Sequence, residues 1–428
     1  MGPQPEKKHS ALEFIGRAFR YRNYRLFFGG QGVSLIGTWM QQIAMSWLVY
    51  RLTDSAFYLG LIGFTGQVPI LFLSSFAGVL ADRIHRRNLL IATQILSALQ
   101  ASILAILTLT GLVQVWHLVT LSLFLGCVNA FDIPTRQSFV IQMIEEKKDL
   151  GNAIALNSFM FNGARLVGPS IAGLVIVAIG EGLCFLVNAL SFLAIIATLL
   201  AMRVPKRETE AETVSVFHGL KQGYRYALGF PPIRFVLFLI AVVSFVGMPY
   251  IVLMPIFARD VLHGGPHTLG FLMGASGVGA VIGALYLASR KSVLGLGRLI
   301  VVASVCFGTG LILFSFSSSF LFSLVMLLLT GFGMIVQMAA ANTLIQTVVD
   351  EDKRGRIMSM YAMAWGGTAP FGNIVAGSLA ARFGAPETLA VSGLICIIGG
   401  LLFFRKLPLI RQATHPVYIK LGIIPRSS

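Results

Sequence analysis

Three ionisable side chains stand inside stretches of sequence that are otherwise apolar, and they are the residues best placed to do chemistry. Asp132 and Arg136 are four positions apart, so a helix would put both on one face, with Pro134 between them. Arg165 stands alone in a later apolar stretch. A charged side chain inside a membrane is unfavourable by several kcal/mol unless it has a partner, so each of the three is a functional candidate.

Both sets allow two roles. Asp132 and Arg136 either form an ion pair that is structural or gates the cytoplasmic exit, which we favour, or Asp132 is a protonatable group coupled to transport. Arg165 needs a carboxylate, carbonyl groups or water around it. Either Asp132 approaches Arg165, or the guanidinium faces an aqueous cavity and binds an anionic part of a substrate.

A further charged cluster lies in a short gap between two apolar stretches, and it reads Gly78-Val-Leu-Ala-Asp82-Arg83-Ile-His85-Arg86-Arg87. Asp82, at the end of a helix, can accept hydrogen bonds from an arginine and from the positive N-terminus of a neighbouring helix. Such a cluster can latch the cytoplasmic side of a membrane protein in one state and break in another. The alternative is a solvated turn whose basic residues only set the topology.

The stretch around Arg165 also combines small residues with a proline. It continues as Arg165-Leu-Val-Gly168-Pro169-Ser-Ile-Ala-Gly173. Pro169 removes a backbone donor and is expected to kink a helix, and the glycines let a second helix approach closely. Two interpretations stay open: a helix that rocks during function, or simple tight packing.

Twelve long apolar stretches must position these residues. An α-helix needs about 20 apolar residues to cross the hydrocarbon core of a bilayer. We predict spans at 26–50, 59–80, 89–113, 117–141, 152–179, 182–202, 233–257, 268–289, 299–317, 320–345, 357–381 and 387–404.

The distribution of charge orients these spans. Of the 33 lysines and arginines, 28 belong to the two tails and to every second gap, whereas the other gaps contain only Arg51, Arg259 and Arg382. Positive charge accumulates in cytoplasmic loops. We therefore expect a multi-pass protein of the cell inner (plasma) membrane with both termini in the cytoplasm, and the short loops suggest a bacterial one.

The chain divides into two halves that echo one another. The expected parts are a cytoplasmic N-terminal tail at 1–25, a six-helix bundle at 26–202, a cytoplasmic linker at 203–232, a second six-helix bundle at 233–404 and a cytoplasmic tail at 405–428. Residues 145–180 and 349–384 align at a constant offset of 204, with paired glycines at 163/367, 168/372, 173/377 and 180/384. The sequence thus predicts an all-α membrane protein of twelve transmembrane helices, with a site between its two bundles near the membrane midplane.

Composition excludes several other classes. The chain is 56% hydrophobic and 12% charged, with a mean hydropathy of +0.81, and a soluble core cannot hide that much apolar surface. The net charge of +16 is spread over short cytoplasmic segments, which suits anionic lipid rather than nucleic acid. The four cysteines lack metal-site spacing, and the loops contain neither a Walker lysine motif nor a Ser-His-Asp set. We expect no enzyme activity, no cofactor and no metal.

The turn at 78–87 resembles the cytoplasmic signature of the major facilitator superfamily, Gly-x-Leu-Ala-Asp-Arg-x-Gly-Arg-Arg, with His85 where the pattern usually has glycine. The Gly-Pro segment of the fifth span is similar to a pattern found in facilitator antiporters. Further strings resemble the bacterial permeases related to the enterobactin exporter and to macrolide-efflux proteins, and they lie at 23–28, 30–34, 132–137 and 219–226. The second half departs from the signature, because its gap between the eighth and ninth spans lacks the aspartate.

The resemblance implies the major facilitator fold, in which the first helix of each three-helix unit lines a central cavity. The candidate lining is then the uncharged polar and aromatic side chains of spans one, four, seven and ten: Thr38, Trp39, Gln41, Gln42, Asn129, Tyr250, Gln337 and Asn342. Spans one, seven and ten contain no acidic residue within the apolar core, so the residues themselves do not establish coupling to protons.

The leading functional expectation is a secondary-active exporter of small amphipathic compounds such as drugs or siderophores. It would rock its halves around a fixed site by proton-driven antiport, as a monomer in the lipid bilayer, with a small-molecule substrate and protons as partners. Export and the proton are implied by the resemblance. The alternatives are an uptake permease for a small metabolite, and a non-transporting membrane receptor or assembly factor on the same scaffold.

Overall fold

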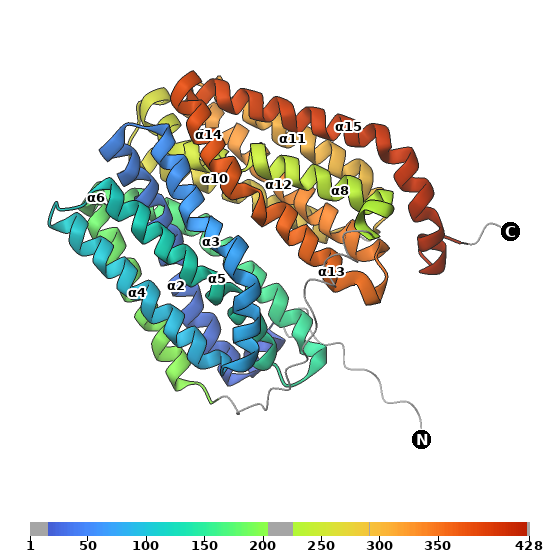
Figure 1. The fold of residues 1–428 in the computed structure, drawn as a ribbon, viewed down its shortest axis with the longest axis horizontal. Helices are drawn as coiled ribbons and strands as arrows, with labels where there is room; N and C mark the ends of the chain where they lie inside the picture. Colours follow the sequence, from blue (N-terminus) through green and yellow to red (C-terminus); the bar gives the residue numbers. More distant parts are fainter. Residues whose placement is uncertain (1–15, 204–225, 291, 426–428) are drawn as a thin grey trace.

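The structure is a computed structural model that describes residues 16–203, 226–290 and 292–425. Within these ranges, the side chains at 75, 78–83, 147 and 352 lie outside the description. The described chain is built from α-helices with short π and 3-10 segments, and Figure 1 shows them as two groups that lie side by side.

The first group holds six spans. It begins with a 3-10 turn, η1, followed by long helices that start and stop at short polar gaps. Their bounds are η1 Arg17–Arg20, α2 Arg22–Thr53, α3 Ala56–Arg83, α4 Arg86–Leu109, α5 Val115–Gln142 and α6 Lys147–Ala201. The run called α6 contains two spans, because Gly180 has φ 82° and ψ 169° and interrupts the helix. Only glycine takes this conformation readily.

The second group also holds six spans, but two of them are interrupted. Its elements are α8 Pro231–Val242, η2 Val243–Gly247, α9 Tyr250–Ile256, η3 Phe257–Val261, α10 Pro266–Ala288, α11 Leu296–Ser315, α12 Phe320–Val348, α13 Glu351–Ala362, η4 Met363–Gly367, α14 Ala369–Phe383 and α15 Ala385–Lys420. The run from α8 to η3 is the seventh span, and the run from α13 to α14 is the eleventh.

The interruptions are π turns that the hydropathy pattern does not reveal. Each of η2, η3 and η4 is a five-residue π segment. Pro249 follows η2 closely and Pro370 follows η4. A proline cannot donate to the carbonyl four residues earlier, so a local change to the wider π register is a natural way to keep the helix continuous.

The twelve predicted spans are confirmed. Nine described helices are long and apolar enough to cross a membrane. One of them, α6, holds two spans, and α2 and the α13–α14 run complete the dozen. The last helix continues beyond the predicted end of its span to Lys420. Many large apolar side chains on the outside stay exposed, among them Phe76 and Leu321, as expected for surfaces that face lipid.

The internal repeat predicted from glycine spacing has a structural counterpart. Gly384 takes φ 99° and ψ 150° where the fifth and sixth spans have Gly180, at the same offset of 204. A Cβ at Gly168 would lie 2.5 Å from Cβ of Trp39 in the first span, and one at Gly372 would lie 2.0 Å from the carbonyl oxygen of Phe245 in the seventh. The matched glycines therefore make the same helix-helix approach in each half.

Candidate functional site

Two ends of the molecule are distinguished by their helix termini. We call the side that contains the starts of α2 and α8 and the end of α15 the near side (Figure 1). The opposite side, with the turns at Asp54, Gly180, Gly265 and Gly384, is the far side.

Two helix crossings join the halves towards the far side, and both depend on glycines. In the first crossing, α6 meets α10, where a Cβ at Gly173 would lie 2.7 Å from the carbonyl oxygen of Pro266. In the second, α3 meets α14, where a Cβ at Gly377 would lie 2.7 Å from the carbonyl oxygen of Ala56. Gly173 and Gly377 are a pair of the internal repeat, so the two crossings are related by the pseudo-symmetry of the fold.

Polar side chains add a second connection between the halves, which we call the far-side latch. The Arg259 guanidinium donates to Oδ1 of Asp54 at 2.5 Å, and the Tyr50 hydroxyl donates to a carboxylate oxygen of Asp260. The guanidinium also lies 5.4 Å from the centre of the Tyr50 ring. Tyr50 and Asp54 belong to the first half, and Arg259 and Asp260 to the second. This cluster was not predicted from the sequence. The available signal was that Arg259 is one of only three basic residues in the gaps opposite the basic side.

On the near side, the corresponding clusters stay within one half. Tyr21 donates to Oδ2 of Asp149 at 2.8 Å, beside the start of α6. Tyr226 donates to Oδ2 of Asp350 at 3.4 Å, and Lys353 donates to the same oxygen at 2.9 Å. The hydrogen bond from Lys353, together with its charge, lowers the pKa of Asp350, whereas burial, with Asp149 adding to it, raises the pKa of Tyr21.

The signature-like turn is only partly described. The backbone of Gly78, Asp82 and Arg83 is helical within α3, and their side chains lie outside the described part. Arg86 donates to the carbonyl oxygen of Ser138 at 3.4 Å, and Arg87 donates to two carbonyl oxygens at the end of α6.

The missing glycine of the signature has a simple explanation. His85 is extended, with φ −60° and ψ 113°, and is the N-cap of α4. The turn therefore needs no left-handed residue at that position. The latch role of the turn remains a proposal, because the side chain of Asp82 is outside the described part.

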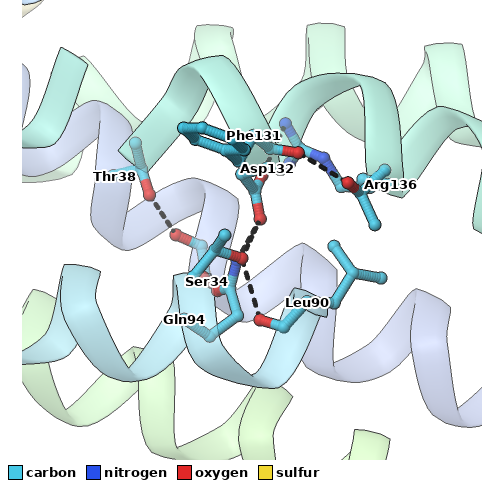
Figure 2. A network of polar contacts seen from close by, with 9 residues as sticks. Ser34, Thr38, Leu90, Gln94, Phe131, Asp132 and Arg136 are labelled. Atoms are coloured by element: carbon cyan, nitrogen blue, oxygen red, sulfur yellow. Dashed lines mark hydrogen bonds and ion pairs between the residues drawn. The ribbon is translucent and has the colours of Figure 1, made fainter. Parts of the chain in front are cut away.

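Asp132 is held by an interhelical network inside the first half (Figure 2). Its Oδ1 accepts hydrogen bonds from Gln94 at 2.7 Å and from Thr93 at 3.0 Å, both in α4, and its Oδ2 lies 3.4 Å from Nη2 of Arg136. Asp132 is 5% exposed. These contacts fit a structural ion pair that joins α4 to α5, and Pro134 lies between the two charges without ending the helix.

Arg165 has different surroundings. It lies about midway between Lys147 and Gly180 and is partly exposed. Its guanidinium lies 5.9 Å from the centre of the Trp39 ring in α2, and its Nη2 lies 3.9 Å from Sδ of Met334 in α12. Among the side chains described, no carboxylate is within ion-pair distance of Arg165. The structure therefore does not bring Asp132 to Arg165.

The remaining members of the Gly-Pro segment are buried at helix contacts. Gly168 packs against α2, and the carbonyl oxygen of Pro169 lies against Gly270 in α10. The backbone stays helical through Pro169, and Gly180 is the one residue within α6 with non-helical angles. Pro169, where we expected a kink, therefore does not interrupt the helix.

The candidate lining residues divide into two groups. Gln41, Tyr250 and Gln337 are fully buried inside a bundle. Gln41 bonds to Gln100 and Asn188, and Tyr250 shares a 2.7 Å hydrogen bond with Ser276. The others are partly or fully exposed, namely Thr38, Trp39, Gln42, Asn129 and Asn342.

The candidate lining residues of α2 that are not buried lie on one face of the helix. Thr38 and Gln42 are four residues apart and flank Trp39, the residue that contacts Arg165. Thr38 also donates to the backbone of Ser34 at 2.9 Å. Among the residues that the structure describes, no group of three His, Cys, Asp or Glu side chains is placed to hold a metal ion.

Two six-helix bundles that meet at one end, with a partly exposed cation between them about midway along its span, are typical of a polytopic membrane transporter. The chain belongs to the major facilitator superfamily: the family model described as transmembrane secretion effector matches residues 17–417. It is a membrane permease and not an enzyme.

Curated relatives cover nearly the whole chain. The Staphyloferrin A transporter of Staphylococcus aureus (strain NCTC 8325 / PS 47) is 26% identical, over 92% of this chain and 99% of its own length. The Multidrug efflux pump Tap of Mycolicibacterium fortuitum is 26% identical, over 90% of this chain and 93% of its own. Macrolide efflux protein A of Streptococcus pyogenes is 23% identical, over 88% and 96%.

Solved structures support the fold. A bacterial homologue of the human lysosomal transporter Spinster, in an inward-facing and unoccupied conformation, matches with a TM-score of 0.70 at 12% identity, over 95% of this chain and 99% of that one. A bacterial homologue of the iron transporter ferroportin, in an inward-facing state, matches with a TM-score of 0.67 at 15% identity, over 93% and 99%.

Proposed function

We propose that this permease is a secondary-active exporter of small amphipathic compounds, working by alternating access between its two halves. The observation that carries the proposal is the closure of the far side by two glycine crossings and the far-side latch. Partly exposed groups from both halves, Arg165 and Asn342, lie away from that closure. A closed far side together with partly exposed groups between the halves is expected for one end state of a transporter whose two halves rock against each other.

The charge pattern assigns the two sides. The near side carries the basic tails and gaps, so we assign it to the cytoplasm of a bacterial cell, with both termini inside. The far side is then external, and the molecule is closed to the outside. Transport requires a second state in which the far-side latch opens and the cytoplasmic turn at 78–87 closes.

Export is favoured by the curated relatives. Two of the three carry the word efflux in their names, and the third is named as a transporter of staphyloferrin A. We propose proton antiport as the driving reaction, because the sequence has no Walker lysine motif for ATP. The network around Asp132 argues for a structural pair there, and we propose that a group other than Asp132 carries the coupled proton.

The test uses a bacterial host that lacks its own efflux pumps. Cells that express the protein should accumulate less of a dye, macrolide or siderophore than cells with an empty vector, and a protonophore should abolish the difference. In everted vesicles, an imposed pH gradient with an acidic interior should drive the same compound inwards. Equal accumulation with and without the protein across the panel would remove the export proposal.

The two alternative functions predict different results in right-side-out and everted vesicles. An uptake permease would load right-side-out vesicles and not everted ones. A non-transporting receptor would bind compounds in both preparations and move none. We also propose that the protein works as a monomer, because a single chain supplies both of the six-helix bundles that enclose the transport path. Light scattering of the purified protein tests this.

A further inference from the structure

The surroundings of Arg165 carry an inference that rests on the proposed function and names its substrate class. The side chain lies where the halves face each other, because Trp39 belongs to α2 of the first half and Met334 to α12 of the second. It is partly exposed, about midway along its span. A group bound there would touch both halves at once, as a substrate in an alternating-access protein must.

None of the described side chains neutralises the charge of Arg165. No carboxylate among the described side chains is within ion-pair distance, and the two contacts it makes, to a thioether and to an aromatic ring, are weak. The guanidinium stays protonated at any physiological pH and presents paired donors that match carboxylate geometry. An uncompensated cation near the membrane midplane strongly favours an anionic ligand.

The side chains that surround the Arg165 guanidinium are apolar and aromatic. Trp39 and Phe161 pack edge to face with ring centres 5.9 Å apart, and Phe161 is 43% exposed. Met334 of the opposite half is 0% exposed, so its thioether supports the guanidinium from behind and is not part of the exposed wall. Such walls suit a flat apolar body next to the anionic group.

Two features separate Arg165 from a residue that only holds the scaffold together. At the offset of the internal repeat, the second half has Ala369, so the fold itself does not need a cation there. In addition, Pro169 has no N–H, which leaves the carbonyl oxygen of Arg165 without its usual donor four residues later. That oxygen can accept a hydrogen bond from water or from a donor group of a ligand.

We propose that Arg165, Trp39 and Phe161 form a binding subsite for amphipathic organic anions, with Met334 buried behind the guanidinium. The guanidinium binds the anionic group, and the two rings flank the apolar body. Binding of an anion replaces the weak contact between Arg165 and Met334, which loosens the connection between the halves at the midplane.

Equilibrium dialysis of the protein in lipid nanodiscs tests the subsite without relying on transport. The probes are 2-naphthoate and its neutral isostere naphthalene-2-carboxamide, each corrected for partition into empty nanodiscs. The wild type should bind the carboxylate about tenfold more tightly than the amide. Arg165→Gln should bring the two affinities together, and Arg165→Lys should keep part of the preference. Arg382→Gln, which removes an exposed charge on the far side, should keep it all.

Trp39→Leu provides a second variant that leaves the charge in place. It should weaken both probes by a similar factor and preserve their ratio, because it removes a wall and not the anion site. Equal affinities of the wild type for the two probes would overturn the proposal, as would a preference that survives Arg165→Gln. A preference that is present while vesicles transport nothing would instead overturn the proposed function, so the two failures are distinguishable.

Discussion

At the scale of single residues, Asp132 and Arg165 have opposite environments within the membrane spans. Asp132 has a partner on each oxygen, from α4 and from its own helix. Arg165 has an aromatic ring and a sulfur atom. The same chemical rule, that an intramembrane charge needs a partner, therefore points to a structural role for Asp132 and to a ligand for Arg165.

Removing the charge of Asp132 tests the structural role. Asp132→Asn loses the ion pair with Arg136 but keeps an acceptor for Gln94, so we expect a loss of about 1–3 kcal/mol in stability with transport retained. Thermal unfolding and pH-driven efflux, measured on the same preparation, check this. Arg136→Gln should have a similar cost, and the double variant little more. Unchanged stability with complete loss of coupling would show that Asp132 carries the proton.

Two buried glutamines form a natural pair for a second test. Gln41 is hydrogen-bonded to Gln100 and Asn188, whereas Gln337 is 0% exposed and neither its Oε1 nor its Nε2 has a partner among the described groups. An unsatisfied buried amide costs about 1–3 kcal/mol. Gln337→Leu should therefore raise the melting temperature, and Gln41→Leu should lower it.

The transport assay completes this comparison. If the Gln337 amide finds a partner in the outward-open state, Gln337→Leu should slow export while it stabilises the purified protein. Should Gln337→Leu destabilise the protein as much as Gln41→Leu does, the amide must already be satisfied in the resting state, and this interpretation fails.

At the scale of elements, the glycines of the repeat decide how closely helices of different halves approach. Gly173 and Gly377 occupy equivalent places in the fifth and eleventh spans and face Gly270 and Gly60. From its sequence alone, the segment around Gly173 fits either a helix that rocks during function or simple tight packing. The structure places the contact at the boundary between the halves. In the proposed alternating-access cycle, this tightly packed contact is the surface that separates.

A single methyl group at these crossings should therefore change the balance of states. Gly173→Ala puts a Cβ 2.7 Å from the carbonyl oxygen of Pro266, a contact that must be relieved by moving the helices apart. Gly163→Ala, on the same helix, is the matched control because nothing lies within 4 Å of its Cβ.

The measurement is the distance between spin labels on the far side, at Thr110→Cys and Ser318→Cys, in a background with the four native cysteines replaced. Gly173→Ala should increase the population with a long distance, and Gly163→Ala should leave it unchanged. Identical distributions for the two variants would mean that the crossing does not limit opening.

At the scale of the whole molecule, the far-side latch links residues that are more than 200 positions apart. Its ion pair between Arg259 and Asp54 is substantially exposed, and exposed pairs contribute up to about 1 kcal/mol. That is small for folding but changes the ratio of two states by about fivefold. Such a latch can bias the resting state without preventing transport.

Arg259→Gln should shift the same pair of spin labels towards the open distance by about this factor at low salt. The difference from wild type should shrink at high ionic strength, because salt screens exposed charges. Arg51→Gln is the matched control: its ion pair with Glu181 joins two parts of the first half and should not affect opening. An effect of Arg51→Gln as large as that of Arg259→Gln would show that the charge, and not the latch, matters.

Local signals in the sequence were enough to determine the membrane class, the twelve spans and the internal repeat. Hydropathy is read from consecutive residues, and the paired glycines, Gly180 with Gly384 for example, lie at a fixed offset that needs no knowledge of contacts. The π turns were not predictable in the same way, because a change in helix register leaves composition and hydropathy untouched.

Only the tertiary structure decided which groups meet. The sequence placed Asp132 and Arg136 on one face, but it left open whether Asp132 or a cavity surrounds Arg165. It contained no sign that Asp54 would find Arg259, since each looks like an ordinary loop charge. A contact between helices of different halves depends on how the halves pack and on which state they adopt, and neither is encoded in any local pattern.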